Sequence, residues 1–387
     1  MKFKIQQNDL LKTLLAVNRS ILAKTNLPIL SGVLISTSGE VLEVLSTNLE
    51  TAARVGAVCK TETTGKAVLP GRILLEFVSQ LPEGEVVFEK LGEEVLVKLG
   101  SYGARFATMP TEDFPAIPKI EKGQTIKFSA GDFVRTVLKV AFCAAADEGR
   151  PVLTGVLCEL EKNLLSMVAT DGYRLGFQKI ATTGEAVPLK IIIPSKSLIE
   201  AAKLIGERTE GKTDESIEMI IADDFNQVNF QVDKLPSAKT GVEFTSRLIE
   251  GEFPNWQKII PTSFNSLARI SKEEFIKLVR IASIFARDSG NIIRLKLEGH
   301  AAKGAGLMTV FATNNQLGSN QAACEIEMTG RGGEIAFNFR YLLEMLSSIE
   351  GEDVNFEMIE SLNPGKFTET DSRDNFFHII MPVRLQS

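Results

Sequence analysis

The chain has 387 residues, more than one compact core usually holds, so its length favours two or three domains. Its 44% hydrophobic and 24% charged residues are typical of a soluble globular protein, and no apolar run approaches the roughly 20 residues of a membrane-spanning helix. The formal net charge of −6, taken as an average, argues against a nucleic-acid partner.

The chain begins with MKFKIQQNDL, which lacks the apolar stretch of a signal peptide, and we expect a cytoplasmic protein. Apolar residues at helical spacing alternate along the chain with short strand-like runs such as KIIIP and EVLVKL. The pattern predicts helices, in chain order, over 8–24, 71–81, 130–146, 195–205, 271–287 and 338–349. Each pair of helices is separated and followed by strands, which indicates an α+β fold.

One element of the chain is written three times, as LSTNLETAARV (45–55), VATDGYRLGF (168–177) and FATNNQLGSNQA (311–322). Thr170 lies 123 residues after Thr47, and Thr313 lies 143 after Thr170. The predicted helices keep nearly the same spacing, and so do the strand-to-helix junctions at Pro70, Pro194 and Asn338, 124 and 144 residues apart. We therefore predict three copies of one domain, with boundaries at 1–122, 123–261 and 262–387.

The sequence motifs of catalysis and metal binding are absent. The chain has two histidines, His300 and His378, and none of the spacings that hold zinc. It contains no phosphate-binding loop, no dinucleotide fingerprint and no nucleophile elbow. The four cysteines form no C-x-x-C pair, and we expect them to be buried thiols. These observations predict a non-catalytic protein without metal or cofactor.

Asp171 is the residue that most resembles a catalytic group, because Tyr173 and Arg174 follow it directly. In the turn signal Thr-Asp-Gly its carboxylate is expected to accept backbone hydrogen bonds. The alternative is a three-domain enzyme with a site at Asp171 and Arg174, which would have a saturable small-molecule substrate.

Positive charge is concentrated on the predicted helices. Summed over the six segments their formal charge is +6, so the rest of the chain carries −12. A basic helix face backed by acidic strands and loops is typical of a surface that faces phosphate. Because no recognition helix, zinc finger or aromatic platform accompanies it, we expect any nucleic-acid binding to be independent of sequence.

Four stretches carry a family resemblance: NLPILSGVLI (26–35), ATDGYRL (169–175), IIIPSKSL (191–198) and IIMPVRL (379–385). They closely resemble the bacterial DNA polymerase III beta sliding clamps, and the resemblance extends over all three repeats. It implies three DNA-clamp domains, each with two helices packed on antiparallel sheets, and a head-to-tail dimer that forms a six-domain ring around double-stranded DNA. The function implied is that of a polymerase processivity factor, which tethers partners and catalyses nothing.

The resemblance also implies a partner-peptide pocket between the second and third domains. Partners insert a short peptide with a glutamine and large apolar side chains. The partners implied are the replicative polymerase alpha subunit, the clamp loader and repair polymerases, besides a second copy of the chain. The matching pocket residues are Arg150, Leu153, Thr170, Gly172, Tyr173, Arg174, Leu175, Pro254, Lys258, Ile259, Leu362, Pro364, Met381, Pro382, Val383, Arg384 and Leu385.

Two further surfaces are predicted. Basic side chains of the helices are expected to face DNA: Lys24, Arg72, Arg135, Lys139, Lys196, Lys203, Arg280 and Arg340. The resemblance implies that the end of the first domain meets the start of the partner's third domain, and the residues expected there are Lys98, Arg105, Phe106, Ile284, Phe285 and Glu298.

The chain departs from the family pattern at three places. Tyr173 stands where a histidine is common, the acidic stretch 145–150 replaces a more neutral one, and Gln386 and Ser387 extend beyond the usual last leucine. Besides the enzyme, a monomeric peptide-binding scaffold remains an alternative, since it would keep the pocket but lack the dimer.

Overall fold

The computed structural model describes residues 1–22, 25–117, 120, 122–147, 149–184, 187–212, 214–233, 240–299, 304–314, 316–370 and 375–384. The chain divides into two compact units. The first consists of Met1–Val134, Thr182–Val187 and Lys196–Ile249, and the second of Arg135–Ala181, Pro188–Ser195 and Glu250–Ser387. The middle third of the chain therefore contributes to both units, and the predicted domain boundaries at 1–122, 123–261 and 262–387 remain a prediction.

The first unit contains two antiparallel sheets. The five-stranded sheet has the order β5 (Lys60–Thr63), β1 (Lys2–Gln6), β7 (Glu85–Leu91), β8 (Glu94–Leu99) and β9 (Tyr102–Ala107). The eight-stranded sheet has the order β10 (Gly123–Ser129), β15 (Ser216–Ala222), β16 (Gln227–Val232), β17 (Val242–Arg247), β4 (Thr51–Val58), β3 (Val41–Thr47), β2 (Gly32–Ser38) and β6 (Gly65–Pro70).

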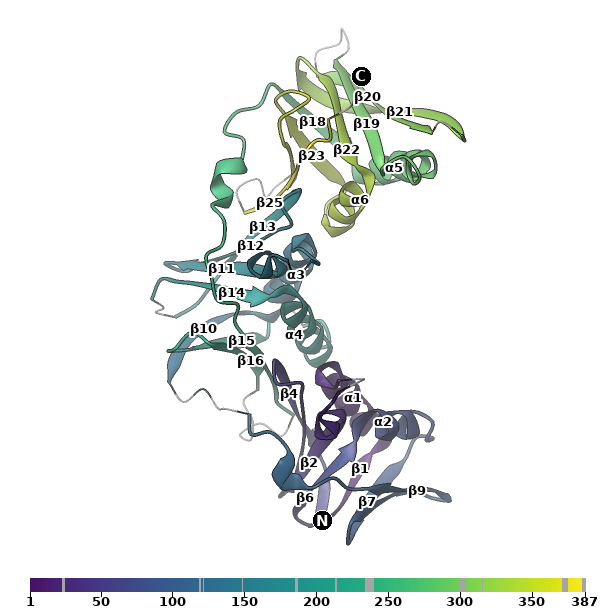
Figure 1. Ribbon diagram of the computed structural model, residues 1–387, viewed down its shortest axis with the longest axis vertical. Coiled ribbons are helices and arrows are strands. Elements are labelled where there is room, and N and C mark those ends of the chain that lie inside the picture. Colours follow the sequence, from purple (N-terminus) through teal and green to yellow (C-terminus); the bar gives the residue numbers. More distant parts are fainter. Residues whose placement is uncertain are drawn as a thin grey trace. The chain divides into compact units, whose positions relative to one another are not determined.

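Helices α1 (Gln7–Val17) and α2 (Gly71–Ser79) lie side by side against these sheets (Figure 1). On α1 the buried residues include Leu10, Leu14 and Val17, which recur at helical spacing and so share one face. Helix α4 (Ser195–Arg208) belongs to this unit apart from its first residue, and α3 (Ala130–Val140) begins in it.

The second unit contains one twelve-stranded sheet and helices α5 (Lys272–Ala286) and α6 (Phe339–Ser348). Its strand order is β14 (Leu189–Pro194), β11 (Gly155–Glu161), β12 (Leu164–Thr170), β13 (Arg174–Ala181), β25 (Phe376–Ile380), β24 (Gly365–Glu369), β23 (Asp353–Met358), β18 (Ser266–Ser271), β21 (Gly318–Gly330), β20 (Ala305–Asn314), β19 (Ile292–Gly299) and β22 (Gly333–Asn338).

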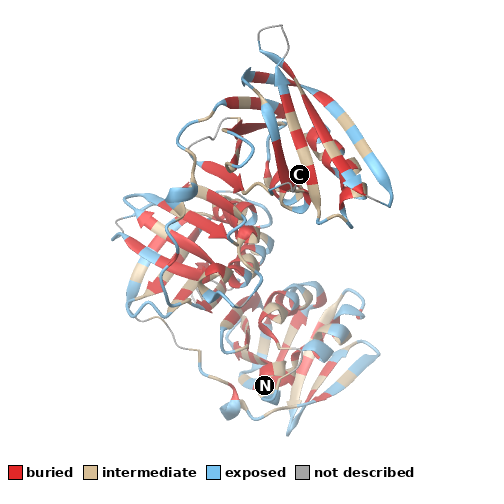
Figure 2. Ribbon diagram, turned by 45° about the horizontal axis from the view of Figure 1, so that its top comes forward, coloured by how far each residue is buried: buried red, intermediate tan, exposed pale blue. Residues whose placement is uncertain are grey.

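The core of the second unit lies between its sheet and the pair α5 and α6, which pack against each other (Figure 1). Phe356 and Phe367 stack with ring centroids 4.6 Å apart, and Phe337 meets both edge-on. Figure 2 shows the buried positions concentrated on the strands. The predicted α+β class with antiparallel sheets is confirmed, because every pairing between named strands of the described residues is antiparallel.

The repeated turn has the same hydrogen bonds in each copy. One side-chain oxygen accepts the backbone N–H groups two and three residues further on, with N···O distances of 2.6 to 3.0 Å, and the acceptors are Asn48, Asp171 and Asn314. The next residue has positive φ in the first two copies, 74° at Leu49 and 90° at Gly172. The local sequence Thr-Asn/Asp therefore builds one turn three times, because an Asx side chain can replace a backbone acceptor.

Two α-helices end well before their predicted last residues. The segment 8–24 is α-helical only to Val17 and continues as a 3₁₀ turn over Asn18–Ser20, and 130–146 ends at Val140 before a 3₁₀ turn over Ala141–Cys143. In the first case Ser46 Oγ on β3 donates to the carbonyl of Val17 at 2.5 Å. Because this cap comes from a side chain on strand β3, the helical spacing of the helix residues alone could not predict where the helix ends.

Candidate functional site

The turn Thr170–Arg174 forms the centre of the predicted peptide pocket, and its backbone is held by its own side chains. Thr170 Oγ1 donates to the carbonyl of Arg174 at 2.6 Å and accepts from the amide of Gly172 at 3.0 Å. Asp171 Oδ1 accepts the amides of Tyr173 and Arg174, and its Oδ2 accepts from Arg174 Nε at 3.0 Å. Asp171 is thus the turn acceptor that the sequence predicts, and both of its oxygens are occupied.

The C-terminal strand brings the chain's tail to this turn. Strand β25 pairs with β13 in a register that sets Leu175 opposite Ile379. Directly after the strand, the amide of Met381 donates to the carbonyl of Tyr173 at 2.8 Å. The following Pro382, Val383 and Arg384 are partly or fully exposed, and the amide of Val383 donates to Ala336 O at 2.8 Å.

Three further segments approach the same place. Arg150 Nη1 lies 4.0 Å from the position that a Cβ atom on Gly172 would take. The 3₁₀ turn Trp256–Ile259 is anchored by its tryptophan, whose ring lies 5.1 Å from that of Phe177 on β13. Strand β24 places Gly365 opposite Ile380. The predicted pocket residues carried by these segments and by the strand ends are therefore gathered within the second unit.

Their exposure separates two groups. Large apolar side chains open to solvent are those of Tyr173 (65% exposed), Leu362 (60%) and Ile259 (36%), and we call these three the apolar rim. Arg150, Gly172, Pro254 and Lys258 are also exposed, while Pro364 and Met381 are half-buried. Leu153, Thr170 and Leu175 are buried and so do not belong to this rim, and Leu385 lies outside the described residues.

The side chain of Arg174 is buried among partners. Its Nη2 donates to the carbonyl of Phe142 at 2.8 Å and its Nη1 to the carboxylate of Glu344. The guanidinium carbon lies 4.6 Å from the ring centre of Tyr341. Burial alone would lower the pKa of Arg174, but the hydrogen bond to Glu344 and neighbouring charges outweigh it, so the pKa is raised and the group stays cationic.

A buried polar chain runs behind the rim. Ser348 Oγ donates to Met345 O at 2.7 Å and lies 3.2 Å from His378 Nε2. On the other side of the ring, Nδ1 lies 3.6 Å from Cys143 Sγ. Burial, followed by the charge of Arg174, lowers the pKa of His378 to about 3, and burial raises the pKa of the Cys143 thiol. Both groups are therefore neutral and structural.

Gly176 makes this chain possible. A Cβ atom at this position would lie 3.0 Å from Cys143 Sγ and 3.1 Å from His378 Cε1, closer than packed side chains tolerate. A glycine in the middle of β13 thus lets the thiol and the imidazole approach each other over the strand.

Comparison with known proteins places this arrangement in a family. Models of the DNA polymerase III beta subunit match residues 1–118 with the N-terminal domain, 127–255 with the central domain and 257–384 with the C-terminal domain. The chain belongs to this family. The predictions of three clamp domains and of a non-catalytic DNA polymerase III subunit are confirmed by this membership.

Individual relatives agree over their full length. The beta sliding clamp of Pseudomonas aeruginosa is 27% identical and that of Synechococcus elongatus 26%, each with 100% of both chains covered. A crystal structure of the DNA polymerase III subunit beta from Pseudomonas aeruginosa has a TM-score of 0.88 at 26% identity over 100% of both chains. Another structure of that clamp, bound to griselimycin, has the same TM-score, identity and coverage.

Four of the side chains expected to face DNA are exposed and unpaired within the part of the chain that the structure describes: Arg72, Lys196, Arg280 and Arg340. Each belongs to a different helix, α2, α4, α5 and α6 respectively. Lys203 is exposed but lies 3.0 Å from Glu200, and Arg135 lies 3.5 Å from Glu350. Lys24 lies outside the described residues.

The prediction that Lys139 faces DNA is wrong. Its side chain is only 4% exposed, and its Nζ lies 2.7 Å from Glu369 and 3.5 Å from Glu350. The ammonium group also lies 4.7 Å from the ring centre of Phe376. A buried lysine with two carboxylate partners offers no charge to a phosphate, and because Glu369 is 230 residues away in sequence, local charge counting missed the pair.

The predicted dimer residues are divided between surface and interior. Ile284 on α5 is 56% exposed and Lys98 is exposed, whereas Phe285 packs partly against the core of the second unit. Phe106 is 6% exposed and meets Phe77 edge-on at 5.7 Å. Two charged residues have partners in their own sheets, since Arg105 lies 3.3 Å from Glu94 and Glu298 lies 2.8 Å from Lys296.

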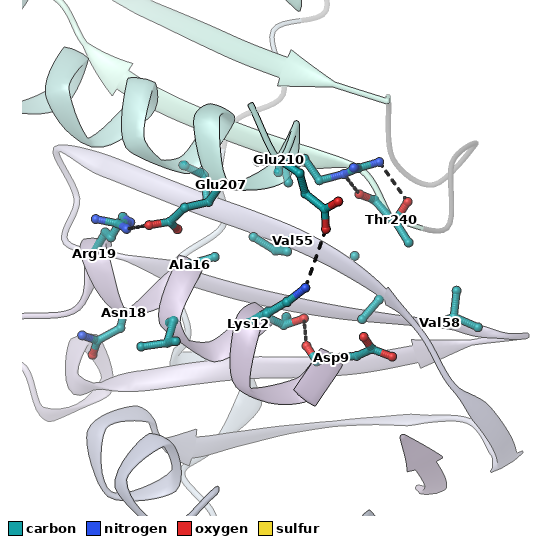
Figure 3. A pocket seen from close by; sticks show the side chains of 17 residues that line it. Asp9, Lys12, Ala16, Asn18, Arg19, Val55, Val58, Glu207, Glu210 and Thr240 are labelled. Carbon is teal, nitrogen blue, oxygen red and sulfur yellow. Dashed lines mark hydrogen bonds and ion pairs between the residues drawn. The ribbon is translucent and has the colours of Figure 1, made fainter. Parts of the chain in front are cut away.

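A cleft in the first unit was not anticipated from the sequence. It has a volume of about 730 Å³ and lies between α1 and the end of α4, above β4 (Figure 3). Across it Lys12 pairs with Glu210 at 3.7 Å, and Arg19 pairs with Glu207 and, at 2.9 Å, with Glu200. Glu200 and Glu207 are seven residues apart and so share one face of α4, a signal that could have pointed to basic partners.

Among the described residues, no helix is long and apolar enough to cross a membrane. No group of three histidine, cysteine or acidic side chains in the described part of the chain could hold a metal ion.

The buried imidazole predicts a specific pH dependence of stability. With the pKa of His378 at about 3 when folded and about 6.5 when unfolded, the unfolded chain binds one more proton between these values. Stability is therefore full above pH 6.5 and falls with a contribution of roughly 1.4 kcal/mol per pH unit as the pH drops toward 3. We expect the variant His378→Gln to lose this contribution, measured as urea midpoints between pH 7 and pH 4.

Ser348→Ala is the matched control. It removes a hydrogen bond to the same imidazole but no titrating group, so it should lower stability at every pH and keep the wild-type slope. A slope unchanged in His378→Gln would show that the imidazole does not titrate between these limits.

Proposed function

We propose that this chain is a processivity clamp: two copies close head to tail into a six-domain ring around duplex DNA and tether a replicative polymerase. The observation that carries the proposal is that all three clamp domains match along one chain, from residue 1 to residue 384. Three similar domains per chain close a pseudo-sixfold ring as a dimer. A topological link holds DNA without tight local contacts, which suits sliding. Its place of action would be the cytoplasm.

The dimer would form through open strand edges. Within the described residues, strand β9 pairs with β8 alone, and the part of β21 from Gly318 to Ile326 pairs with β20 alone, since β18 joins only its end. An unpaired edge is a template for a strand of another chain. Exposed Ile284 on neighbouring α5 supplies apolar area beside such a junction. Strand β19, which carries Glu298, has β20 on one side and β22 on the other, so Glu298 is a weaker candidate.

We expect Ile284→Lys to convert the dimer into a folded monomer. A lysine at this exposed position leaves the fold intact but puts an unpaired charge into the interface, which costs several kcal/mol. Sedimentation equilibrium should then give 42.3 kDa instead of twice that mass. The control Leu164→Lys, at a position 46% exposed on β12, should remain dimeric. A dimeric Ile284→Lys variant would move the interface elsewhere.

DNA would be held by the four unpaired basic side chains on separate helices. Reversing their charge removes phosphate contacts, each worth about 0.9 in the slope of log affinity against log salt concentration. We expect weaker binding of a labelled duplex and a salt slope smaller by about 3.6 for each chain, measured by fluorescence anisotropy, for the quadruple glutamate variant at Arg72, Lys196, Arg280 and Arg340.

The matched control reverses four exposed lysines outside the helices, at Lys60, Lys122, Lys162 and Lys212. It changes net charge equally and should keep most of the salt slope. Equal losses in the two quadruple variants would contradict a lining formed by α2, α4, α5 and α6.

Partners would dock on the apolar rim through a short peptide with a glutamine and large apolar side chains. The polymerase alpha subunit, a clamp loader and repair polymerases are the partners proposed. Supporting this, the rim gathers exposed apolar side chains around fixed backbone groups, an arrangement suited to an extended peptide. The site is incomplete without Met381, whose amide bonds to Tyr173.

We expect Leu362→Asp to weaken binding of a fluorescein-labelled Gln-Leu-Ser-Leu-Phe peptide at least tenfold, because burying one apolar side chain is worth about 1.5 to 3 kcal/mol. Leu362 is 60% exposed, so the fold should be unaffected. Leu317→Asp, at a position 59% exposed, is the control and should bind normally. Unchanged affinity of Leu362→Asp would place the pocket elsewhere.

A further inference from the structure

Arg174 connects the turn Thr170–Arg174, here called the docking turn, to two other elements of the second unit. Its guanidinium group donates to Asp171 in the turn, to the carbonyl of Phe142 after α3, and to Glu344 on α6. It also lies over the rings of Tyr341 and Phe142, at 4.6 and 5.3 Å. Only 12% of the Arg174 side chain is exposed, so its guanidinium group is engaged in contacts within the protein and is not free to bind a ligand.

Backbone hydrogen bonds of Arg174 also fix the main chain next to the apolar rim. The amide of Arg174 donates to Asp171, its carbonyl accepts from Thr170, and its strand position faces Ile380. The neighbouring Tyr173 carbonyl holds the amide of Met381. A shift of Arg174 would therefore move both Tyr173 and Met381, whose backbones are hydrogen-bonded to each other.

Glu344 is the part of this arrangement that lies away from the rim. Its side chain is 52% exposed and lines a shallow hollow of about 330 Å³ with Leu138, Phe142 and Ser347. None of these three residues belongs to the predicted pocket. Replacing Glu344 would thus loosen Arg174 without removing a side chain of the rim.

The repeat shows that this connection is special to the second unit. Glu344 lies 144 residues after Glu200, the same spacing that separates the junctions at Asn338 and Pro194. Glu200 also binds an arginine, but this is Arg19, which follows α1 and reaches Glu207 as well (Figure 3). At the turn position equivalent to Arg174 the first copy has Thr51. Glu76, the equivalent residue of the first copy, has no ion pair within the described residues, so of the three equivalent glutamates only Glu344 pairs there with an arginine of a Thr-Asn/Asp turn.

We propose that Glu344 is a positioning residue for the partner-peptide pocket, holding Arg174 so that Tyr173 and Met381 keep the spacing that a peptide needs. The inference rests on the proposed function for its ligand, but the contacts that carry it belong to the free protein. Arg174 then acts through the backbone of the turn, and the peptide's glutamine is left to the main chain and the exposed rim residues.

The experiment compares Glu344→Ala, Glu344→Gln and Glu200→Ala in the full-length protein. We expect Glu344→Ala to weaken binding of the Gln-Leu-Ser-Leu-Phe peptide about fivefold to tenfold, as loss of a charge-assisted hydrogen bond implies. Glu344→Gln keeps a carbonyl acceptor and should recover most of the affinity. Glu200→Ala breaks the equivalent pair in the first unit and should stay within about twofold of the wild type.

Amide hydrogen exchange in the free protein separates positioning from general stability. Loss of the pair between Glu344 and Arg174 should speed exchange of the amides of Tyr173, Arg174 and Met381 about tenfold in Glu344→Ala, while the thermal midpoint of the protein changes little. Unchanged exchange at these amides overturns the proposal, and so does equal weakening of peptide binding by Glu200→Ala. A wild type that binds no peptide refutes the proposed pocket instead, and the exchange comparison still decides whether Glu344 holds the turn.

Discussion

The pairing of β13 with β25 is the constraint on which the candidate site depends. Five antiparallel residue pairs, from Arg174 with Ile380 to Gln178 with Phe376, bring the end of the chain to a turn 200 residues earlier. The register decides which side chains meet, because a shift by one residue would turn every side chain to the other face. It places Met381 at Tyr173 on one side, and on the other it lets Gly176 accept the approach of Cys143 and His378.

Three titratable side chains around this pairing, His378, Lys139 and Arg174, have close partners, although Gln178 Oε1 on β13 is buried without a hydrogen bond to any described residue. The imidazole has a thiol and a hydroxyl as neighbours, Lys139 has two carboxylates, and Arg174 has a carboxylate at each end and a carbonyl between. Buried groups paired in this way specify one arrangement, since losing a partner leaves a charge or donor without solvent. The exposed side chains of the apolar rim therefore lie on a backbone that is already fixed. This lowers the conformational entropy that would be lost on binding the proposed peptide.

The first unit has the same kind of strand pairing but different side-chain packing beside it. Strands β4 and β17 pair as β13 and β25 do, but beside them a cleft remains, spanned by the exposed ion pair of Lys12 with Glu210. Surface pairs of this kind contribute little stability. The two units thus show that one repeated domain can carry an ordered turn with exposed apolar side chains in one place and an open cleft in another.

Much of this was readable from the sequence. The three Thr-Asn/Asp turns, the six helices and the α+β class follow from local patterns, because an Asx turn and an amphipathic helix need only residues within a few positions of one another. The family resemblance supplied the pocket residues, and those from separate segments do gather in the second unit. Exposure was not readable: Lys139 and Leu175 have the right residue types, yet burial removes the first from the DNA-facing surface and the second from the apolar rim.

What the sequence determined by itself is therefore the repeat, its turns and the faces of its helices. Which charges are neutralised, which apolar residues stay open and which glutamate pairs with Arg174 were decided only by the tertiary structure. The partners concerned, such as Lys139 with Glu369 or Arg174 with Glu344, are 230 and 170 residues apart. Their meeting depends on strand register and helix packing, which no local pattern of residues encodes.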